Sequence, residues 1–158
     1  SVESTDGKKV LIFSKTGGWR HKSIEPGREL LKQALANKGI EIVVSEDAGI
    51  FTDQSLSGFS ALVFLNTTGD ILNDAQQVAM ERYIQAGGGF VGIHAATDTE
   101  WRGDWIWYRR LVGGVFASHP NVPSKYTLSL QFFMMMFKLL FPLFKFRKAR
   151  TSRAFLGY

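Results

Sequence analysis

Four short apolar runs constrain the fold of this chain more than any other feature of its sequence. They occupy residues 10–13, 40–44, 61–65 and 90–93, and only Glu41 and Gly92 interrupt them. Continuous runs of β-branched, aliphatic and aromatic residues are typical of strands that are buried on both faces, as in a parallel sheet covered by helices. The runs therefore predict four buried strands.

Helical patterns separate these runs. The first helix is predicted to begin after Ser23, whose hydroxyl can cap it, and to end before Gly39. The second is predicted from about residue 73 to residue 86, and Asn73 and Gln76 have the spacing of a capping box. Strands that alternate with helices indicate a doubly wound α/β domain, a three-layer sandwich with a parallel sheet.

The residues that follow the apolar runs indicate where a site should lie. Ligands of doubly wound sheets bind at the carboxyl ends of the strands. Hydroxyl, amide, carboxylate and imidazole groups follow three of the runs: His21, Asn66, Thr67, His94 and Asp98. This chemistry suits a polyhydroxylated ligand better than an apolar one.

Two glycine-rich segments resemble known site motifs without matching them. The Gly17-Gly18 pair lacks the spacings of a phosphate-binding loop, so we interpret it as a flexible turn. The segment around His94 has small neighbours, Ala95 among them, and lies where a strand should turn sharply, which is the geometry of a nucleophile elbow. Because its central residue is His and not Ser or Cys, ordinary acyl transfer is not expected there.

Three histidines, His21, His94 and His119, fall in predicted loops at the same edge of the sheet. Histidine in a cleft acts as a general acid or base, or as a metal ligand, and Asp98 is a candidate carboxylate partner. Three unrelated surface histidines are the simpler alternative. The aromatic group that begins at Trp101 fits either a stacking wall for a sugar ring or packing under a long loop.

Charge and composition exclude some partners. Residues 1–119 carry 12 basic and 14 acidic residues, whereas residues 120–158 carry seven basic residues and no acid. The net charge of +5 therefore belongs to the last quarter of the chain, and no nucleic-acid partner is expected for the body. The chain has no cysteine, which excludes disulfides and cysteine nucleophiles. Both a cytoplasmic and a secreted location remain open.

The motifs of the body resemble the ThuA-like (trehalose utilisation) domain family. The similar segments are KVLIFSKTGGWRHKSI at 9–24, VFLNTTGD at 63–70, GGGFVGIHAATD at 87–98 and LVGGVFASHP at 111–120. The resemblance covers about residues 8–120, after an N-terminal extension of residues 1–7. It implies the class I glutamine amidotransferase-like fold, a flavodoxin-like sandwich. It also implies no amidotransferase activity, because His94 occupies the elbow position of the cysteine and no cysteine is present.

The resemblance further implies a role in carbohydrate utilisation, on trehalose-like disaccharides or their keto-derivatives. His94 and Asp98 are the expected catalytic residues of a hydrolase or isomerase of modified sugars. The expected substrate contacts are His21, Asn66, Thr67, Trp101 and His119. A divalent metal such as zinc on His21, His94 and His119 is a further expectation. The alternative is a non-catalytic sugar-binding or interaction module with the same fold.

Residues 121–158 depart from the family pattern. Residues 128–144 are largely apolar and are followed by basic residues, as in a membrane tail anchor, but Lys138 and Pro142 interrupt them. A basic amphipathic segment that binds a partner is a second interpretation. The abrupt change in composition, with seven Phe in 120–158, favours a third: a truncated domain followed by sequence foreign to the family. Membrane contact is expected only if the apolar segment is genuine.

Overall fold

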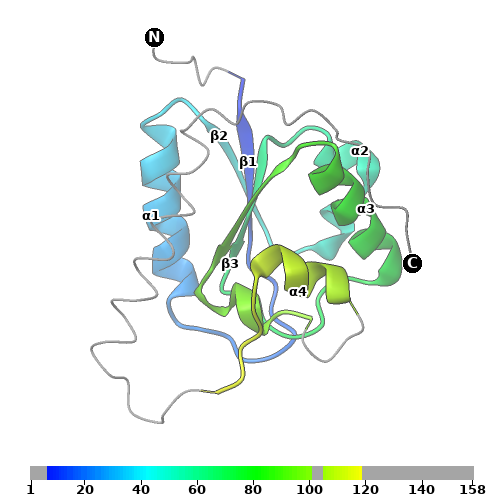
Figure 1. The fold of residues 1–158 in the computed structure, drawn as a ribbon. Helices are drawn as coiled ribbons and strands as arrows, with labels where there is room; N and C mark the ends of the chain where they lie inside the picture. The colour runs from blue at the N-terminus through cyan, green and yellow to red at the C-terminus, as the bar shows by residue number, and fades with distance from the viewer. Residues whose placement is uncertain (1–6, 101–104, 119–158) are drawn as a thin grey trace.

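A computed structural model describes residues 7–100 and 105–118 of the chain, and the rest is drawn in grey in Figure 1. It contains one parallel sheet of four strands in the order β2-β1-β3-β4. The strands are β1 (Lys9–Phe13), β2 (Glu41–Ser45), β3 (Ala61–Leu65) and β4 (Gly89–Ile93). All four coincide with the predicted runs to within one residue at each end. The flavodoxin-like α/β fold is confirmed.

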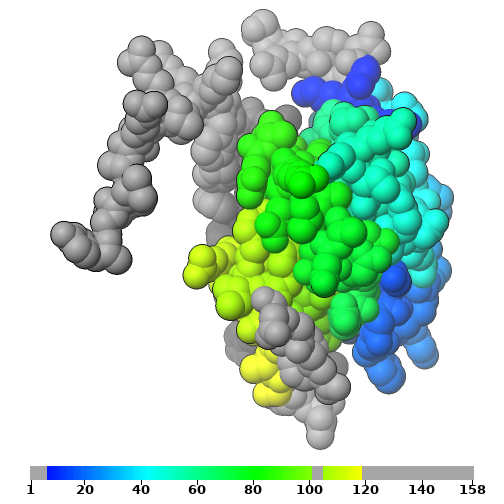
Figure 2. All heavy atoms as spheres, turned by 90° about the vertical axis from the view of Figure 1, so that its right-hand side faces the viewer, coloured from blue at the N-terminus to red at the C-terminus, as the bar shows by residue number. Residues whose placement is uncertain are grey.

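Helices cover both faces of the sheet (Figure 1). One face carries α1 (Ile24–Ala36), and the other carries α2 (Asp53–Leu56), α3 (Asp74–Gln85) and α4 (Ile106–Val112). Two short 3₁₀ helices, η1 (Ala48–Ile50) and η2 (His94–Asp98), follow β2 and β4. Figure 2 shows the face on which α3 and α4 lie over the sheet. The direction of winding reverses between β1 and β3, which is the switch point where ligands of such folds bind.

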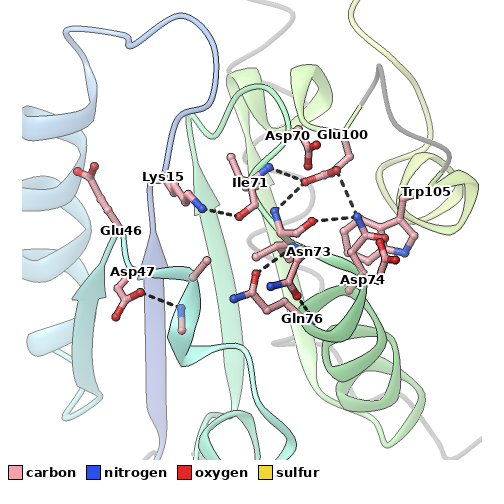
Figure 3. Close-up of a pocket in the computed structure, with 14 residues that line it drawn as sticks. Lys15, Glu46, Asp47, Asp70, Ile71, Asn73, Asp74, Gln76, Glu100 and Trp105 are labelled. Carbon is pink, nitrogen blue, oxygen red and sulfur yellow. Dashed lines mark hydrogen bonds between the residues drawn. The ribbon is translucent and has the colours of Figure 1, made fainter.

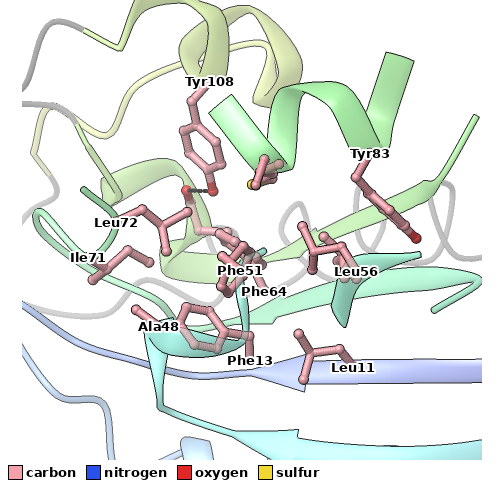
Figure 4. Close-up of a cluster of buried hydrophobic side chains, with 14 of the residues drawn as sticks. Leu11, Phe13, Ala48, Phe51, Leu56, Phe64, Ile71, Leu72, Tyr83 and Tyr108 are labelled. Atoms are coloured by element: carbon pink, nitrogen blue, oxygen red, sulfur yellow. Dashed lines mark hydrogen bonds between the residues drawn. The ribbon is translucent and has the colours of Figure 1, made fainter. Parts of the chain in front are cut away.

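The core has one part on each face of the sheet, which explains why the strands are apolar throughout. Leu11, Phe13 and Phe64 point toward α2, α3 and α4 (Figure 4), while Ile12 and Val63 belong to the cluster on the α1 face. Successive side chains of a strand alternate between faces, so both sets must be apolar when both faces are covered.

The two predicted helix starts differ in outcome. The capping box before α3 is confirmed, because Asn73 Oδ1 accepts from the Gln76 backbone N–H at 3.0 Å and Gln76 Oε1 accepts from the Asn73 N–H at 2.9 Å. Ser23 precedes α1 as predicted, but its side chain makes no capping hydrogen bond. Its Oγ instead accepts from Asn66 Nδ2 at 2.9 Å, since it lies over the end of β3.

No helix within residues 7–100 and 105–118 is long and apolar enough to cross a membrane. The apolar segment 128–144 lies outside the described residues, as does the whole of the predicted tail.

Candidate functional site

His94 lies on a sharp turn directly after β4, as the elbow pattern predicts. Its φ of +53° is left-handed, a conformation that non-glycine residues seldom adopt. The residues around His94 are small because the turn is crowded. A Cβ on Gly92 would lie 3.1 Å from the Cβ of the buried Ala96, which is closer than ordinary van der Waals contact. The His94 side chain is exposed at this turn. The chain therefore holds an imidazole in a strained conformation at the carboxyl end of the sheet.

His21, from the loop after β1, lies against His94. The centroids of the two imidazole rings are 4.7 Å apart, and the rings meet edge to face at 81°. These residues are 73 positions apart in sequence, so only the parallel sheet brings them together. Two adjacent imidazoles can hold and pass a proton, or contribute two nitrogen ligands to an ion.

Asn66 follows β3, the strand between those that position the two histidines. Like His94 it has a φ of +53°, and its backbone N–H donates to the Ile93 carbonyl at 3.2 Å. Its side chain is only 3% exposed, and Nδ2 donates to Ser23. Its Oδ1 is buried without a hydrogen-bond partner. A buried amide oxygen without a partner destabilises the folded state, and such atoms are rare in folded proteins.

The other predicted residues have varied positions. Thr67 is fully buried, and its hydroxyl accepts from Thr99 Oγ1 at 2.8 Å, so in this structure it connects two loops and faces no solvent. Asp98 is partly buried at the end of η2, four residues after His94, and its carbonyl accepts from the Gly69 N–H at 2.9 Å. Trp101 and His119 lie outside the described residues.

The predicted metal site is only partly covered by the structure. His21 and His94 supply two neighbouring donors, and His119 is outside the described residues. Within residues 7–100 and 105–118, no group of three or more His, Cys, Asp or Glu side chains is arranged to hold an ion. A zinc site needs at least three protein ligands, so the metal remains a prediction.

The turn at Gly17-Gly18 is fixed by pairing, contrary to the expected flexible turn. The Gly17 N–H donates to the Thr68 carbonyl at 2.6 Å, and Thr68 Oγ1 donates to the Trp19 carbonyl at 2.9 Å. Bridges between Thr16 and Thr68 and between Gly69 and Thr99 continue the sheet beyond its strands. The loops after β1, β3 and β4 thus form one connected layer beneath the histidines.

Trp19 and Ser23 are neighbours of the site that the sequence did not indicate. The Trp19 side chain is 74% exposed, two residues before His21. Its ring is therefore available to a ligand as an apolar face. Ser23 was expected only as a helix cap, and nothing in its local sequence signals the bond to Asn66.

A charged cluster borders the same loop. Arg20 donates to Glu25 at 2.6 Å and to Glu46 at 3.0 Å, and Arg28 also donates to Glu46. Hydrogen bonds from Arg20 hold the pKa values of both Glu46 and Glu25 below the ordinary value for a glutamate. These ion pairs join the loop before His21 to α1 and to the end of β2.

A polar cavity of about 1030 Å³ lies on the other side of these loops, toward α3 (Figure 3). Its walls include Lys15, Asp47, Asp70 and Glu100, and they do not include His21 or His94. Glu100 is the least expected of these residues, because a carboxylate in a loop is usually solvated and this one is buried.

Comparisons with known proteins agree with this architecture. The ThuA family, described as trehalose utilisation, matches residues 9–139, which extends beyond the motifs that suggested it. A crystal structure of a ThuA-like protein from Bacteroides uniformis superposes with a TM-score of 0.60 at 24% sequence identity. The superposition covers 72% of this chain and 46% of that protein, so the chain spans about half of its length. No curated protein sequence matches this chain. Since the family covers most of its length, the chain belongs to the ThuA family.

Proposed function

We propose that this chain acts in carbohydrate utilisation, on trehalose-like disaccharides or their keto-derivatives. The observation that carries this proposal is the edge-to-face pair of His21 and His94, with His94 on a strained turn at the carboxyl end of the sheet. The family's description supplies the substrate class. Strained residues concentrate at functional sites, where the surrounding fold must hold them in place.

The chemistry that fits this pair is proton transfer in a hydrolase or an isomerase. An imidazole has an ordinary pKa near neutrality, so His94 suits a general acid or base, with Asp98 as a second titratable group. Cysteine-dependent glutamine hydrolysis is not proposed, since the elbow carries His94 and the chain contains no cysteine.

Turnover of trehalose and of its keto-derivative, followed by chromatography of the products, tests the proposal. Wild-type protein should convert at least one of them, and His94→Asn and His21→Asn should each slow conversion by about 100-fold or more. Gln85→Asn is the control, because this exposed side chain lies at the far end of α3. Binding without conversion would support the alternative, a sugar-binding module. Conversion that survives both His substitutions would refute the assigned site.

The predicted zinc has a separate test. Zinc supplies Lewis-acid chemistry and an activated water when it is bound, and His21, His94 and His119 are the residues proposed to hold it. Elemental analysis should find near-stoichiometric metal in the wild-type protein and less in His94→Ala. Protein that binds sugar normally without metal would leave the histidines as hydrogen-bonding groups only.

A further inference from the structure

Glu100 is a buried acidic residue with a left-handed backbone, and both properties are unusual for a glutamate. It is 1% exposed, and its φ of +55° makes it the third non-glycine residue with a left-handed backbone in the part of the chain that the structure describes. Its Oε1 accepts from the backbone N–H groups of Ile71 at 2.7 Å and Leu72 at 3.0 Å (Figure 3). One carboxyl oxygen thus holds the segment that leads into α3.

A second acid lies beside Glu100. The carboxyl of Asp70 is adjacent to that of Glu100 at the wall of the polar cavity (Figure 3). The ammonium of Lys15, in the same cavity, donates to the Ile71 carbonyl at 2.8 Å. Two neighbouring carboxylates repel one another unless one of them keeps its proton. Burial, reinforced by Asp70, raises the pKa of Glu100 above its ordinary value of 4.5.

Other polar groups also surround this carboxyl. Gln77, from α3, donates to its Oε2 at 3.4 Å. Tyr108, from α4, is a buried titratable group nearby, and burial raises the pKa of its hydroxyl. The charged groups that line the same cavity are Lys15, Glu46, Asp47, Asp70 and Asp74. Of these groups, Asp70 is the one that raises the pKa of Glu100, whereas the backbone N–H groups of Ile71 and Leu72 lower it, and burial decides the direction.

The segment that Glu100 holds is connected to the histidine site. The Glu100 N–H donates to the Gly69 carbonyl at 3.0 Å, and the Gly69 N–H donates to the Asp98 carbonyl at 2.9 Å. Residues 67–69 and residues 98–100 are therefore joined by hydrogen bonds, Thr99 to Thr67 among them.

We infer that Glu100 is a positioning residue for the His21–His94 site: as a neutral acid it donates to Asp70 while its other oxygen holds residues 71 and 72. This inference rests on the site of the proposed function, but its tests do not use sugar turnover. Ionisation of Glu100 would place two carboxylates against one another and loosen the paired loops.

Glu100→Gln is the central variant, because the amide keeps the shape, accepts from the same N–H groups and donates to Asp70 but does not titrate. A group whose pKa is raised on folding stabilises fully below its ordinary value, and that stability is lost as the pH rises through the raised value. Amide protection of Ile71 and Leu72, corrected for intrinsic exchange, should therefore fall above pH 4.5 in wild type. The total fall should be about tenfold for every pH unit by which folding raises the pKa of Glu100. Protection should stay level in Glu100→Gln.

The NMR signals of the His21 and His94 rings provide the second measurement. In wild type they should report the same pH step in addition to their own titration, and in Glu100→Gln that step should be absent. Asp70→Asn should move the step to lower pH. An unchanged pH profile in Glu100→Gln would overturn the inference, as would a profile that calcium or a chelator shifts, since the two acids would then hold a cation. A wild-type protein that converts neither sugar but shows the pH step would contradict the proposed function and leave this inference standing.

Discussion

Asn66 and His94 follow adjacent strands and have the same left-handed backbone. Each makes a side-chain contact that depends on this conformation. Such a conformation costs on the order of 1–3 kcal/mol for a residue with a side chain. At His94 the gain is an exposed imidazole that contacts His21, and at Asn66 it is an amide directed at Ser23. The fold tolerates this strain because the loops after β1, β3 and β4 are hydrogen-bonded to one another and keep both turns in place.

Substitutions at His94 should separate this strain from the chemistry. His94→Asn and His94→Gly should leave the free energy of unfolding within about 1 kcal/mol of wild type, because both residues accept a left-handed backbone. His94→Val should lower it by about 1–3 kcal/mol, because a β-branched residue does not. Chemical denaturation measures all three. Equal stabilities would show that the turn relaxes and is not held.

The sequence predicted the residues of the site unevenly. His94 was predictable, because Gly92 and the alanines after it are a local steric signature of a sharp turn. The buried amide oxygen of Asn66 and the buried carboxyl of Glu100 were not predictable. The Asn66 amide is placed through its nitrogen, which donates to Ser23, and the Glu100 carboxyl through Ile71 and Leu72, so each depends on residues at least 28 positions away. Local composition carries no information about such contacts.

At the scale of elements, the loops after β1 and β3 approach so closely that Gly17 and Gly69, one from each loop, leave no room for a side chain. A Cβ on Gly17 would lie 2.7 Å from the backbone carbonyl oxygen of Asp70, whereas a Cβ on Gly18 would meet Thr68 at an ordinary 3.4 Å. The close approach permits the hydrogen bond from Gly17 to Thr68 that fixes the turn.

Gly17→Ala and Gly18→Ala form a matched pair that tests this contact. Gly17→Ala should reduce the free energy of unfolding by about 1–3 kcal/mol, because the added methyl forces two backbones apart. Gly18→Ala should change it by less than about 0.5 kcal/mol. Thermal melts of both variants decide the matter, and equal losses would refute the steric argument.

The ion pairs around Glu46 join three elements, and their effect should depend on pH. Since Arg20 lowers the pKa of Glu46, the cluster stabilises above the ordinary value of 4.5, and that stability is lost as the pH falls through the lowered value. The Glu46 side chain is 39% exposed, so solvent screens the effect. Glu46→Gln should cost less than about 1 kcal/mol at pH 7 and low salt.

Urea denaturation at pH 7 and pH 3, each with and without 1 M salt, measures this difference. The difference between the two proteins should shrink from pH 7 to pH 3 and at high salt, because protonation and screening both weaken the pairing. A difference that neither the lower pH nor the salt reduces would mean that Glu46 acts through packing.

At the scale of the whole molecule, the layers and strands were largely predictable. Both faces of the strands are apolar, and this pattern alone requires helices on both sides of the sheet. The pattern predicted no order for the strands, and the resemblance implied only a flavodoxin-like sandwich. The polar cavity beside α3 was not predictable, since its walls come from loops that only the assembled sheet brings together.

Chemical-shift mapping of a bound disaccharide tests the central claim most directly. Backbone amide spectra of the full chain, recorded during titration with trehalose and with its keto-derivative, report where the sugar binds. The largest changes should lie in residues 17–23, 66–69 and 94–98, the loops that carry His21, Asn66 and His94. Changes confined to the cavity residues Asn73, Gln76 and Gln77 would contradict the account, as would spectra that neither sugar alters.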